Sequence, residues 1–322
     1  MLIAMLLSSV MSLSVLTEPA APEVKAPEAA PTAEIGPTVK MIENGAEPRA
    51  LARLALKPGD VQLVTMDMDM QMKMAMDGVA SPTPRMPTVT FQMRIAVDEA
   101  LPSGWWKYTC GITGLDVKAT EQTPPEMATM MKALVSEMVG MTMSAEVDTL
   151  GHQRNFAVVS KITNPMLLQQ LESMKQSLTQ MSLALPEPEI GVGAKWGVET
   201  VATLGGVSSR QRTTYRLISR EGDTIRLGIS VQQSPGEKDS PIRNLPEGIT
   251  GTLIDLAGDS RGELLYNLTS VIAKEGRVTG ESVVNMNMEG QGMKAKVDTQ
   301  TTIAMTIRST GAADSPPAQP KP

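Results

Sequence analysis

Cysteine and histidine are nearly absent from this chain, which has one of each among its 322 residues. The single cysteine, Cys110, excludes an internal disulfide and any metal site built from several cysteines. The single histidine, His152, excludes a zinc site with two or more histidines, and a Ser-His-acid triad would have to centre on it. His152 stands beside a predicted turn, where we expect a solvated side chain. We therefore predict that the protein is not an enzyme and has no catalytic residues and no cofactor.

Lysine and arginine form no cluster in the sequence, and the net charge is −6. Proteins that bind nucleic acids usually carry a clustered basic face for the phosphate backbone, so we expect no nucleic-acid partner. The glycines of Gly191-Val192-Gly193 open a predicted strand, whereas a phosphate loop follows a strand and opens a helix. The carboxylate pair Asp67 and Asp69 lies on the polar face of a predicted strand, without a signal of the burial that acid-base catalysis requires.

One apolar run without charges opens the sequence, from Leu2 to Leu16. It is shorter than the roughly 20 residues that a membrane-spanning helix needs. No lysine or arginine precedes it, but small residues follow at Ala20 and Ala21, and this order is typical of a secretory signal peptide, which we assign to residues 1–21. We therefore expect an exported protein, periplasmic or extracellular, without a stable transmembrane segment after processing.

Proline, alanine and glutamate dominate the stretch after the signal peptide, and we predict a disordered linker over residues 22–49. Residues 311–322, which end S-P-P-A-Q-P-K-P, have the same character and are predicted to be a disordered tail. Such compositions bury too little apolar surface to offset the entropy that is lost when a chain becomes ordered.

Aromatic residues make up only 2% of the chain, whereas methionine occurs 25 times. Six of the methionines occupy alternate positions from Met66 to Met76, with mostly polar residues between them. A period of two predicts a β-strand with one methionine face, because successive strand side chains point to opposite sides. Methionine is apolar, unbranched and polarizable, so such a face suits an adaptable apolar surface.

A first β unit with one helix is predicted over residues 50–160. Phe91, Met93 and Ile95 share one face of a second strand, which forms a hairpin with the methionine strand. The helix begins at Thr123-Pro124-Pro125-Glu126, which has the spacing of a capping box with proline at the first helical position. Its apolar stripe consists of Met127, Met130, Met131, Leu134 and Met138.

An amphipathic helix and a connection are predicted over residues 161–190, followed by a second β unit over residues 191–310. One face of this helix carries Leu167, Leu171, Met174, Leu178 and Met181. In the second unit, Met286 and Met288 precede a glycine-containing turn, and Met305 lies on the returning strand. This hairpin repeats the pattern of the first, so we predict two related β units.

The predicted fold class is mainly β, with curved antiparallel sheets or an incomplete barrel built from the two β units and two amphipathic helices packed on an apolar face. We expect this face to line a ligand cavity. The predicted lining residues are Met66, Met68, Met70, Met72, Met74, Phe91, Met93, Ile95, Met130, Leu134, Leu171, Met174, Met286, Met288 and Met305.

Three turn-and-strand patterns carry a family resemblance. The sequence reads Leu56-Lys57-Pro58-Gly59-Asp60 before the methionine strand, Val192-Gly193-Ala194-Lys195-Trp196 at the start of the second half, and Gly262-Glu263 before the final hairpin. In these patterns the chain resembles a family of uncharacterised secreted bacterial proteins that carry a domain of unknown function. The resemblance implies no activity and no functional residues. In shape alone, the predicted fold is similar to the lipoprotein-localisation carriers, in which a curved sheet holds acyl chains beneath helices.

The predicted function is that of an exported, non-enzymatic binding protein that holds an apolar ligand, a lipid or an acyl chain, in a methionine-lined cavity. One alternative is a structural or interaction protein of the cell envelope with a filled core. A second alternative is Cu(I) handling, because clusters of thioethers select soft Cu(I), and Met66, Met68 and Met70 would then be the ligands. The sequence indicates no particular protein partner.

Overall fold

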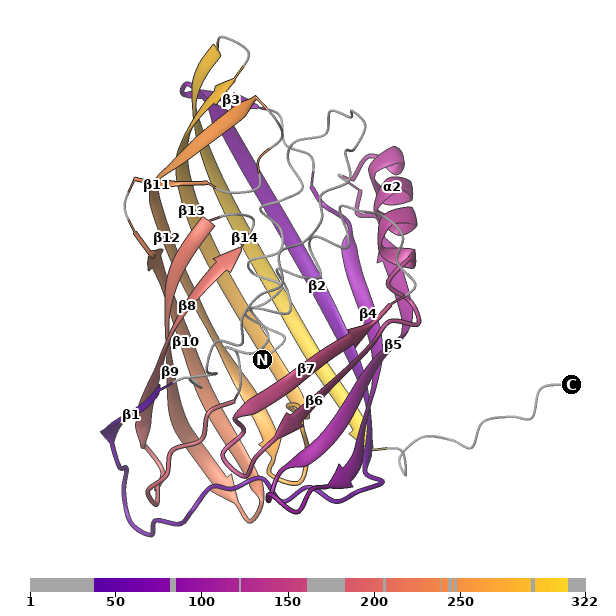
Figure 1. Cartoon of the computed structure of the whole chain (residues 1–322), viewed down its shortest axis with the longest axis vertical. Helices are drawn as coiled ribbons and strands as arrows, with labels where there is room; N and C mark the ends of the chain where they lie inside the picture. The colour runs from indigo at the N-terminus through magenta and orange to yellow at the C-terminus, as the bar shows by residue number, and fades with distance from the viewer. Residues whose placement is uncertain are drawn as a thin grey trace, which may run out of the picture.

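The computed structural model describes residues 38–81, 85–121, 123–160, 183–204, 207–237, 239–242, 245, 248–290 and 293–311. These residues form a 14-stranded antiparallel sheet, so the prediction of a mainly β protein is confirmed (Figure 1). The first half of the chain contributes β1 (Thr38–Glu43), β2 (Val61–Met76), β3 (Val79–Ser81), β4 (Thr88–Ala100), β5 (Trp106–Lys118), β6 (Thr142–Val147) and β7 (Gln153–Val159). The second half contributes β8 (Lys195–Leu204), β9 (Val207–Glu221), β10 (Thr224–Pro235), β11 (Ser240–Pro241), β12 (Ile249–Asn267), β13 (Glu275–Gly290) and β14 (Met293–Gly311).

The two halves of the chain share one sheet. The strand order is β1-β8-β9-β10-β12-β13-β14-β2-β4-β5-β6-β7, with β11 paired to β12 and β3 paired to β2. The halves meet where β14 pairs with β2, from Val297 opposite Met76 to Gly311 opposite Gln62. The regions predicted as two β units are therefore continuous with each other.

The sheet is strongly curved and open. Figure 1 shows the sheet curving from β1 and β8 at one end, through β13, β14 and β2, to β6 and β7 at the other end. Among the described strands, β1 and β7 are the two edges and do not pair with each other. Bulges interrupt the pairing at Thr113 of β5, at Ile218 of β9 and at Ile254 of β12. Because a bulge bends its strand and increases the local twist, these positions account for part of the curvature.

One α-helix lies in the described part of the chain, α2 (Pro125–Ser136), and it packs beside β5. It begins at the predicted proline pair, but the predicted capping box is wrong. The N-cap residue is Pro124, without a side-chain cap, and the hydroxyl of Thr123 instead accepts a hydrogen bond from the backbone N–H of Thr120 at 3.1 Å. The second predicted helix lies largely outside the described residues, which resume at Leu183.

The predicted linker over residues 22–49 extends too far toward the C-terminus. Thr38–Glu43 forms β1, which pairs with β8, and Met41 lies opposite Trp196. Val39 and Met41 pack against the main core, because the alternation of these two residues with Thr38 and Lys40 gives the segment one apolar face. The predicted signal peptide and the tail after Gly311 lie outside the described residues.

Two extended segments cross the lower end of the sheet, and we call residues 44–57 and residues 183–194 the crossing segments. They are hydrogen-bonded to each other from Ala46 N to Val192 O at 2.8 Å, and Ala50 and Ile190 form an isolated bridge. The first crossing segment also reaches the β6–β7 turn, where Leu54 N donates to Thr149 O at 2.8 Å. Figure 1 shows this segment running along the bottom of the sheet, from β1 toward the strands at the opposite edge.

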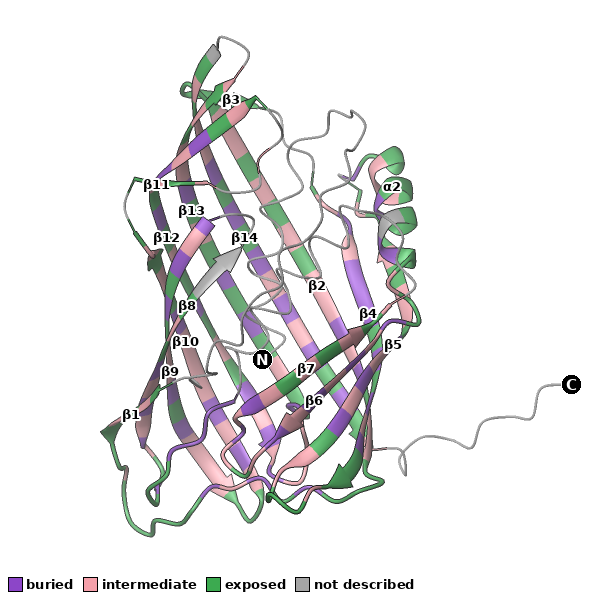
Figure 2. Ribbon diagram, viewed as in Figure 1, coloured by how far each residue is buried: buried purple, intermediate pink, exposed green. Residues whose placement is uncertain are grey.

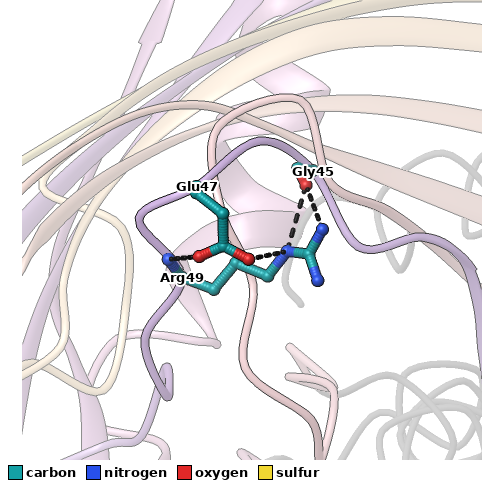
Figure 3. Close-up of polar contacts among 3 residues, drawn as sticks. All are labelled: Gly45, Glu47 and Arg49. Carbon is teal, nitrogen blue, oxygen red and sulfur yellow. Dashed lines mark hydrogen bonds and ion pairs between the residues drawn. The ribbon is translucent and has the colours of Figure 1, made fainter.

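An arginine stabilises the bend at the start of the first crossing segment (Figure 3). The Arg49 guanidinium donates from Nε and Nη2 to the carbonyl oxygen of Gly45 at 3.1 and 3.0 Å. The Glu47 carboxylate lies 3.4 Å from Arg49 Nε and also accepts from the backbone N–H of Arg49 at 3.1 Å. These contacts are exposed to solvent, so they define the path of the chain more than they add to its stability.

The main core fills the space between the lower half of the sheet and the crossing segments. Trp196 is fully buried, stacks on Tyr215 with ring centroids 5.5 Å apart, and donates from Nε1 to Ala184 O at 2.8 Å. Leu54 of the crossing segment and Met66 of β2 belong to the same cluster. Residues from strands far apart in the sheet therefore meet on one side of it, which identifies that side as the inner, concave face.

No helix in the described ranges is both long enough and apolar enough to span a membrane.

The contact between the crossing segments leaves no room for a side chain at Gly191. A β-carbon there would overlap the carbonyl oxygen of Ala46, which is backbone and cannot move aside alone. We expect Gly191→Ala to lower the free energy of unfolding by about 1–3 kcal/mol, measured by urea denaturation. Gly197→Ala on β8 is the control, because its β-carbon would meet no atom closer than Ile42 Cδ1 at 3.7 Å. Equal stability of the two variants would show that the crossing segments are not tightly apposed.

Candidate functional site

The methionines of β2 lie on the concave face. Met66 is opposite Phe91 of β4 and Ile307 of β14, and Met68 is opposite Met305. Residues that pair across antiparallel strands point to the same side of the sheet, so each row of partners continues the face across several strands. The predicted alternation of the methionine strand and its pairing with the strand of Phe91 are both confirmed.

Burial changes along the methionine row (Figure 2). Met66 is 1% exposed and belongs to the main core, whereas Met76 at the other end of β2 is 51% exposed. Met68, Met70, Met72 and Met74 are half-buried. The apolar face therefore extends beyond the packed lower core.

The other predicted lining residues on the sheet fall into two groups. Phe91, Met93, Ile95 and Met305 are buried in the main core. Met286 is half-buried against a second, smaller cluster on the upper part of the concave face, and Met288 is half-buried on the same strand. We call this second cluster the upper cluster; its buried residues are Val207, Leu253, Leu256 and Val284.

Met130 of α2 is predicted to line the site, and its side chain is 47% exposed. The helix buries Met131 and Val135 instead, which are four residues apart and share one side of α2. The backbone of Leu134 lies within α2 but its side chain is not described, and Leu171 and Met174 lie outside the described residues.

Polar residues on the concave face are the part of the site that the sequence analysis missed. Gln211, Ser260, Thr299 and Thr301 are buried, at 2%, 8%, 6% and 6% exposure. They occupy inward positions of β9, β12 and β14 that the sequence analysis did not name. The available signal was the small and polar residues at alternate positions of β12, Gly258, Ser260 and Gly262.

Charged side chains are kept to the convex face. On six strands, every second residue points to the concave side, and these inward-pointing residues are uncharged. The ranges, each given by its first and last inward-pointing residue, are Met66 to Met76 on β2, Ser209 to Leu217 on β9, Leu227 to Gln233 on β10, Leu256 to Leu264 on β12, Val278 to Met288 on β13 and Val297 to Ile307 on β14. Asp67 and Asp69 point the other way, where Asp67 accepts a hydrogen bond from Thr90 Oγ1 at 2.8 Å and is paired with Arg308.

A shallow hollow of about 380 Å³ lies on the convex face across β10, β12, β13 and β14. Its charged lining includes Arg226, which lies 3.5 Å from the Glu263 carboxylate, together with Glu275, Arg277 and Arg308. The sheet thus separates a charged outer surface from an uncharged inner one.

The side chains that could bind a metal or react chemically do not lie together. In the described ranges, no three His, Cys, Asp or Glu residues are grouped as a metal site would require. Cys110 is buried, and burial raises the pKa of its thiol to about 12, so it is protonated at neutral pH and a poor ligand. Met66, the first of the predicted copper ligands, is 1% exposed, so it does not lie at an accessible rim.

His152 has a local partner in the β6–β7 turn. Its Nδ1 lies 2.9 Å from Asp148 Oδ2, and Asp148 Oδ1 accepts from the backbone N–H groups of Leu150 and His152 at 2.9 and 2.8 Å. The hydrogen bond with Asp148 raises the pKa of His152, and this outweighs partial burial. Burial raises the pKa of Asp148, but the hydrogen bonds from His152 and the backbone outweigh it and leave that pKa lowered. His152 is therefore partnered and half-buried rather than solvated as predicted.

No protein-family model matches the chain, and no curated protein does. Among solved structures, the outer membrane protease OmpT from Escherichia coli is 8% identical with a TM-score of 0.26, over 80% of this chain and 98% of that one. The outer membrane protein OprG from Pseudomonas aeruginosa is 8% identical with a TM-score of 0.22, over 80% and 98%. At such TM-scores, no property of these proteins is carried over.

The His152–Asp148 pair predicts a pH-dependent contribution to stability. Because the folded pKa of His152 is raised above 6.5, its contribution is complete below pH 6.5 and is lost as the pH rises through the folded value. Because the folded pKa of Asp148 is lowered below 3.8, its contribution is present above pH 3.8 and is lost at lower pH. We expect His152→Gln to lower the free energy of unfolding by about 1 kcal/mol near pH 5.5 and by less near pH 8.5, measured by urea denaturation. A difference that does not change with pH would contradict the assignment.

Proposed function

We propose that this protein is an exported, non-enzymatic binding protein that holds an apolar ligand, a lipid or an acyl chain, against its methionine-lined concave face. One observation carries the proposal: the uncharged concave face continues past Met68, which packs against the main core, and Met70, Met72 and Met74 on it are half-buried. A large apolar surface that is not packed into a core is typical of a binding surface.

Methionine suits this role physically. Its flexible, polarizable side chain adapts to ligands of different shape, and burial of apolar area contributes roughly 25 cal/mol per Å² without a specific polar contact. Met286 and Met288 of β13 extend the same surface beside β14, opposite Val297 and Ala295. A ligand that lies along these strands would contact several methionines at once.

A structural protein of the cell envelope with a filled core is the second candidate. The lower half of the concave face favours it, because Trp196, Leu217, Leu227 and Leu264 leave at most 1% of their surfaces exposed. The half-buried methionines above that core favour the binding protein. Copper handling has weaker support, because Met66, one of its three candidate ligands, is buried in the core at 1% exposure.

Two single variants, each with one new charge on one face of β2, test the proposal. Met70→Glu places a carboxylate on the concave face, and Gln71→Glu places one on the convex face of the same strand. Because a carboxylate is costly to bury against an acyl chain, we expect Met70→Glu to lower the retention of co-purified lipid by about tenfold or more, and Gln71→Glu to leave it unchanged. Native mass spectrometry of detergent-free protein measures the retained mass, and urea denaturation confirms that both variants fold. Equal retention, or a wild-type protein that binds no lipid, would favour the structural protein.

Replacement of sulfur without loss of apolar volume separates lipid binding from copper handling. Leucine matches methionine in volume but has no thioether, so we expect the double variant Met68→Leu, Met70→Leu to retain lipid within about twofold of the wild type. The same variant titrated with Cu(I) should behave as the wild type does. Loss of tight Cu(I) binding with unchanged lipid retention would support the copper alternative.

A further inference from the structure

A row of small and polar residues crosses the concave face between its two apolar clusters. The members lie opposite one another on consecutive strands from β8 to β14, and we call them the polar row: Thr200, Gln211, Gln233, Gly258, Ser282 and Thr301. On β9, Leu217 of the main core lies on one side of Gln211, and Val207 of the upper cluster lies on the other. On β12, Leu264 and Leu256 flank Gly258 in the same way. The polar row therefore divides the apolar face into two halves.

Gln211 is the buried hydrogen-bond donor of this row. Its residue is 2% exposed, and its side-chain Nε2 has no hydrogen-bond partner within the described part of the chain. Native proteins rarely leave a buried amide donor unpaired, because the lost hydration is not replaced. Thr301, at the other end of the row, is buried at 6% exposure. The row thus presents an unpaired amide and a buried hydroxyl at the middle of an apolar surface.

The charges around Gln211 exclude an anionic partner at this place. Its neighbours on β9, Arg210 and Arg212, point to the convex face, where Arg212 is paired with Glu199 at 2.7 Å. The inward-pointing residues of the strand ranges given above include no lysine and no arginine. A carboxylate or phosphate on the polar row would therefore lose its hydration without gaining a cation, whereas an uncharged carbonyl oxygen would accept hydrogen bonds from the amide and the hydroxyls.

We propose that the ligand is a neutral lipid ester, of which a diacylglycerol is the simplest example. Its ester carbonyls accept hydrogen bonds from Gln211 and the hydroxyls of the polar row, and its acyl chains lie on the apolar surfaces to either side. This inference rests on the proposed function and adds the chemical class of the ligand. It also gives the interrupted pattern of β12 a role, because the Gln233 side chain of the polar row lies over Gly258, where a β-carbon would stand only 2.7 Å from Gln233 Oε1.

Two lipids with the same acyl chains test the ligand class. The full-length protein, freed of lipid by solvent extraction and refolding, is titrated with dioctanoylglycerol and with dioctanoyl phosphatidate by displacement of an apolar fluorescent dye. These lipids differ only in the phosphate, so we expect the neutral lipid to bind about tenfold or more tightly than the anionic one.

Substitution of Gln211 tests its role. We expect Gln211→Leu to weaken dioctanoylglycerol binding about five- to tenfold, because the variant removes the amide that donates to an ester carbonyl. The urea midpoint should stay the same or rise, since the variant removes an unpaired buried donor. Gln232→Leu, at the neighbouring position on the convex face of β10, is the matched control and should change neither affinity. If Gln211→Leu lowers stability, Gln211→Met retains the side-chain length and serves instead.

The outcomes distinguish this inference from the function on which it rests. Equal affinity for the two lipids, or unchanged dioctanoylglycerol binding by the Gln211 variants, would overturn the neutral-ester assignment. If Met70→Glu still abolished lipid retention in that case, the binding function would stand with a different ligand. Failure of both lipids to bind the wild-type protein would overturn the inference together with the proposed function.

Discussion

The structure depends on the hydrogen bonds that tie the two ends of an open sheet to each other across its lower end. A sheet with two edges has no strand pairing to hold them at a fixed distance, so curvature alone would leave the concave face undefined. The crossing segments supply this constraint. Ala46 and Ala50 bond to the segment before β8, and Leu54 bonds to the β6–β7 turn. The core around Trp196 forms beneath these contacts and orders the lower half of the concave face.

From this constraint follows the difference between the lower and upper halves of the concave face. Below, Met66, Leu217 and Leu264 are packed as in any protein core. Above, the same strands continue past the crossing segments and carry half-buried methionines and the polar row. One set of long strands therefore serves both as core and as candidate binding surface, with Met66 and Met76 at opposite ends of a single row.

The alternation of side chains separates charge between the two faces of the sheet. Ion pairs such as Arg226–Glu263 and Arg308–Asp67 lie on the convex side, where solvent screens them and they contribute little to stability. The concave side has amide and hydroxyl groups as its polar features, and Gln211 is the most buried of them. Alternation of side chains along a strand achieves this separation residue by residue, because neighbours such as Gln211 and Arg212 point in opposite directions.

Strands with a regular alternation of apolar and polar residues were predictable from the sequence by itself. The pattern from Met66 to Met76 determined that β2 is a strand with one methionine face, and the proline pair before Glu126 marked the start of α2. Strand β12 was missed, because Gly258, Ser260 and Gly262 interrupt the apolar side and the bulge near Asp255 shifts the period. Tertiary structure decided what local patterns do not encode: the pairing of β14 with β2, the burial of Gln211 and the exposure of Met130. These depend on contacts between residues far apart in the chain, and a pattern within one strand or helix carries no information about its partner.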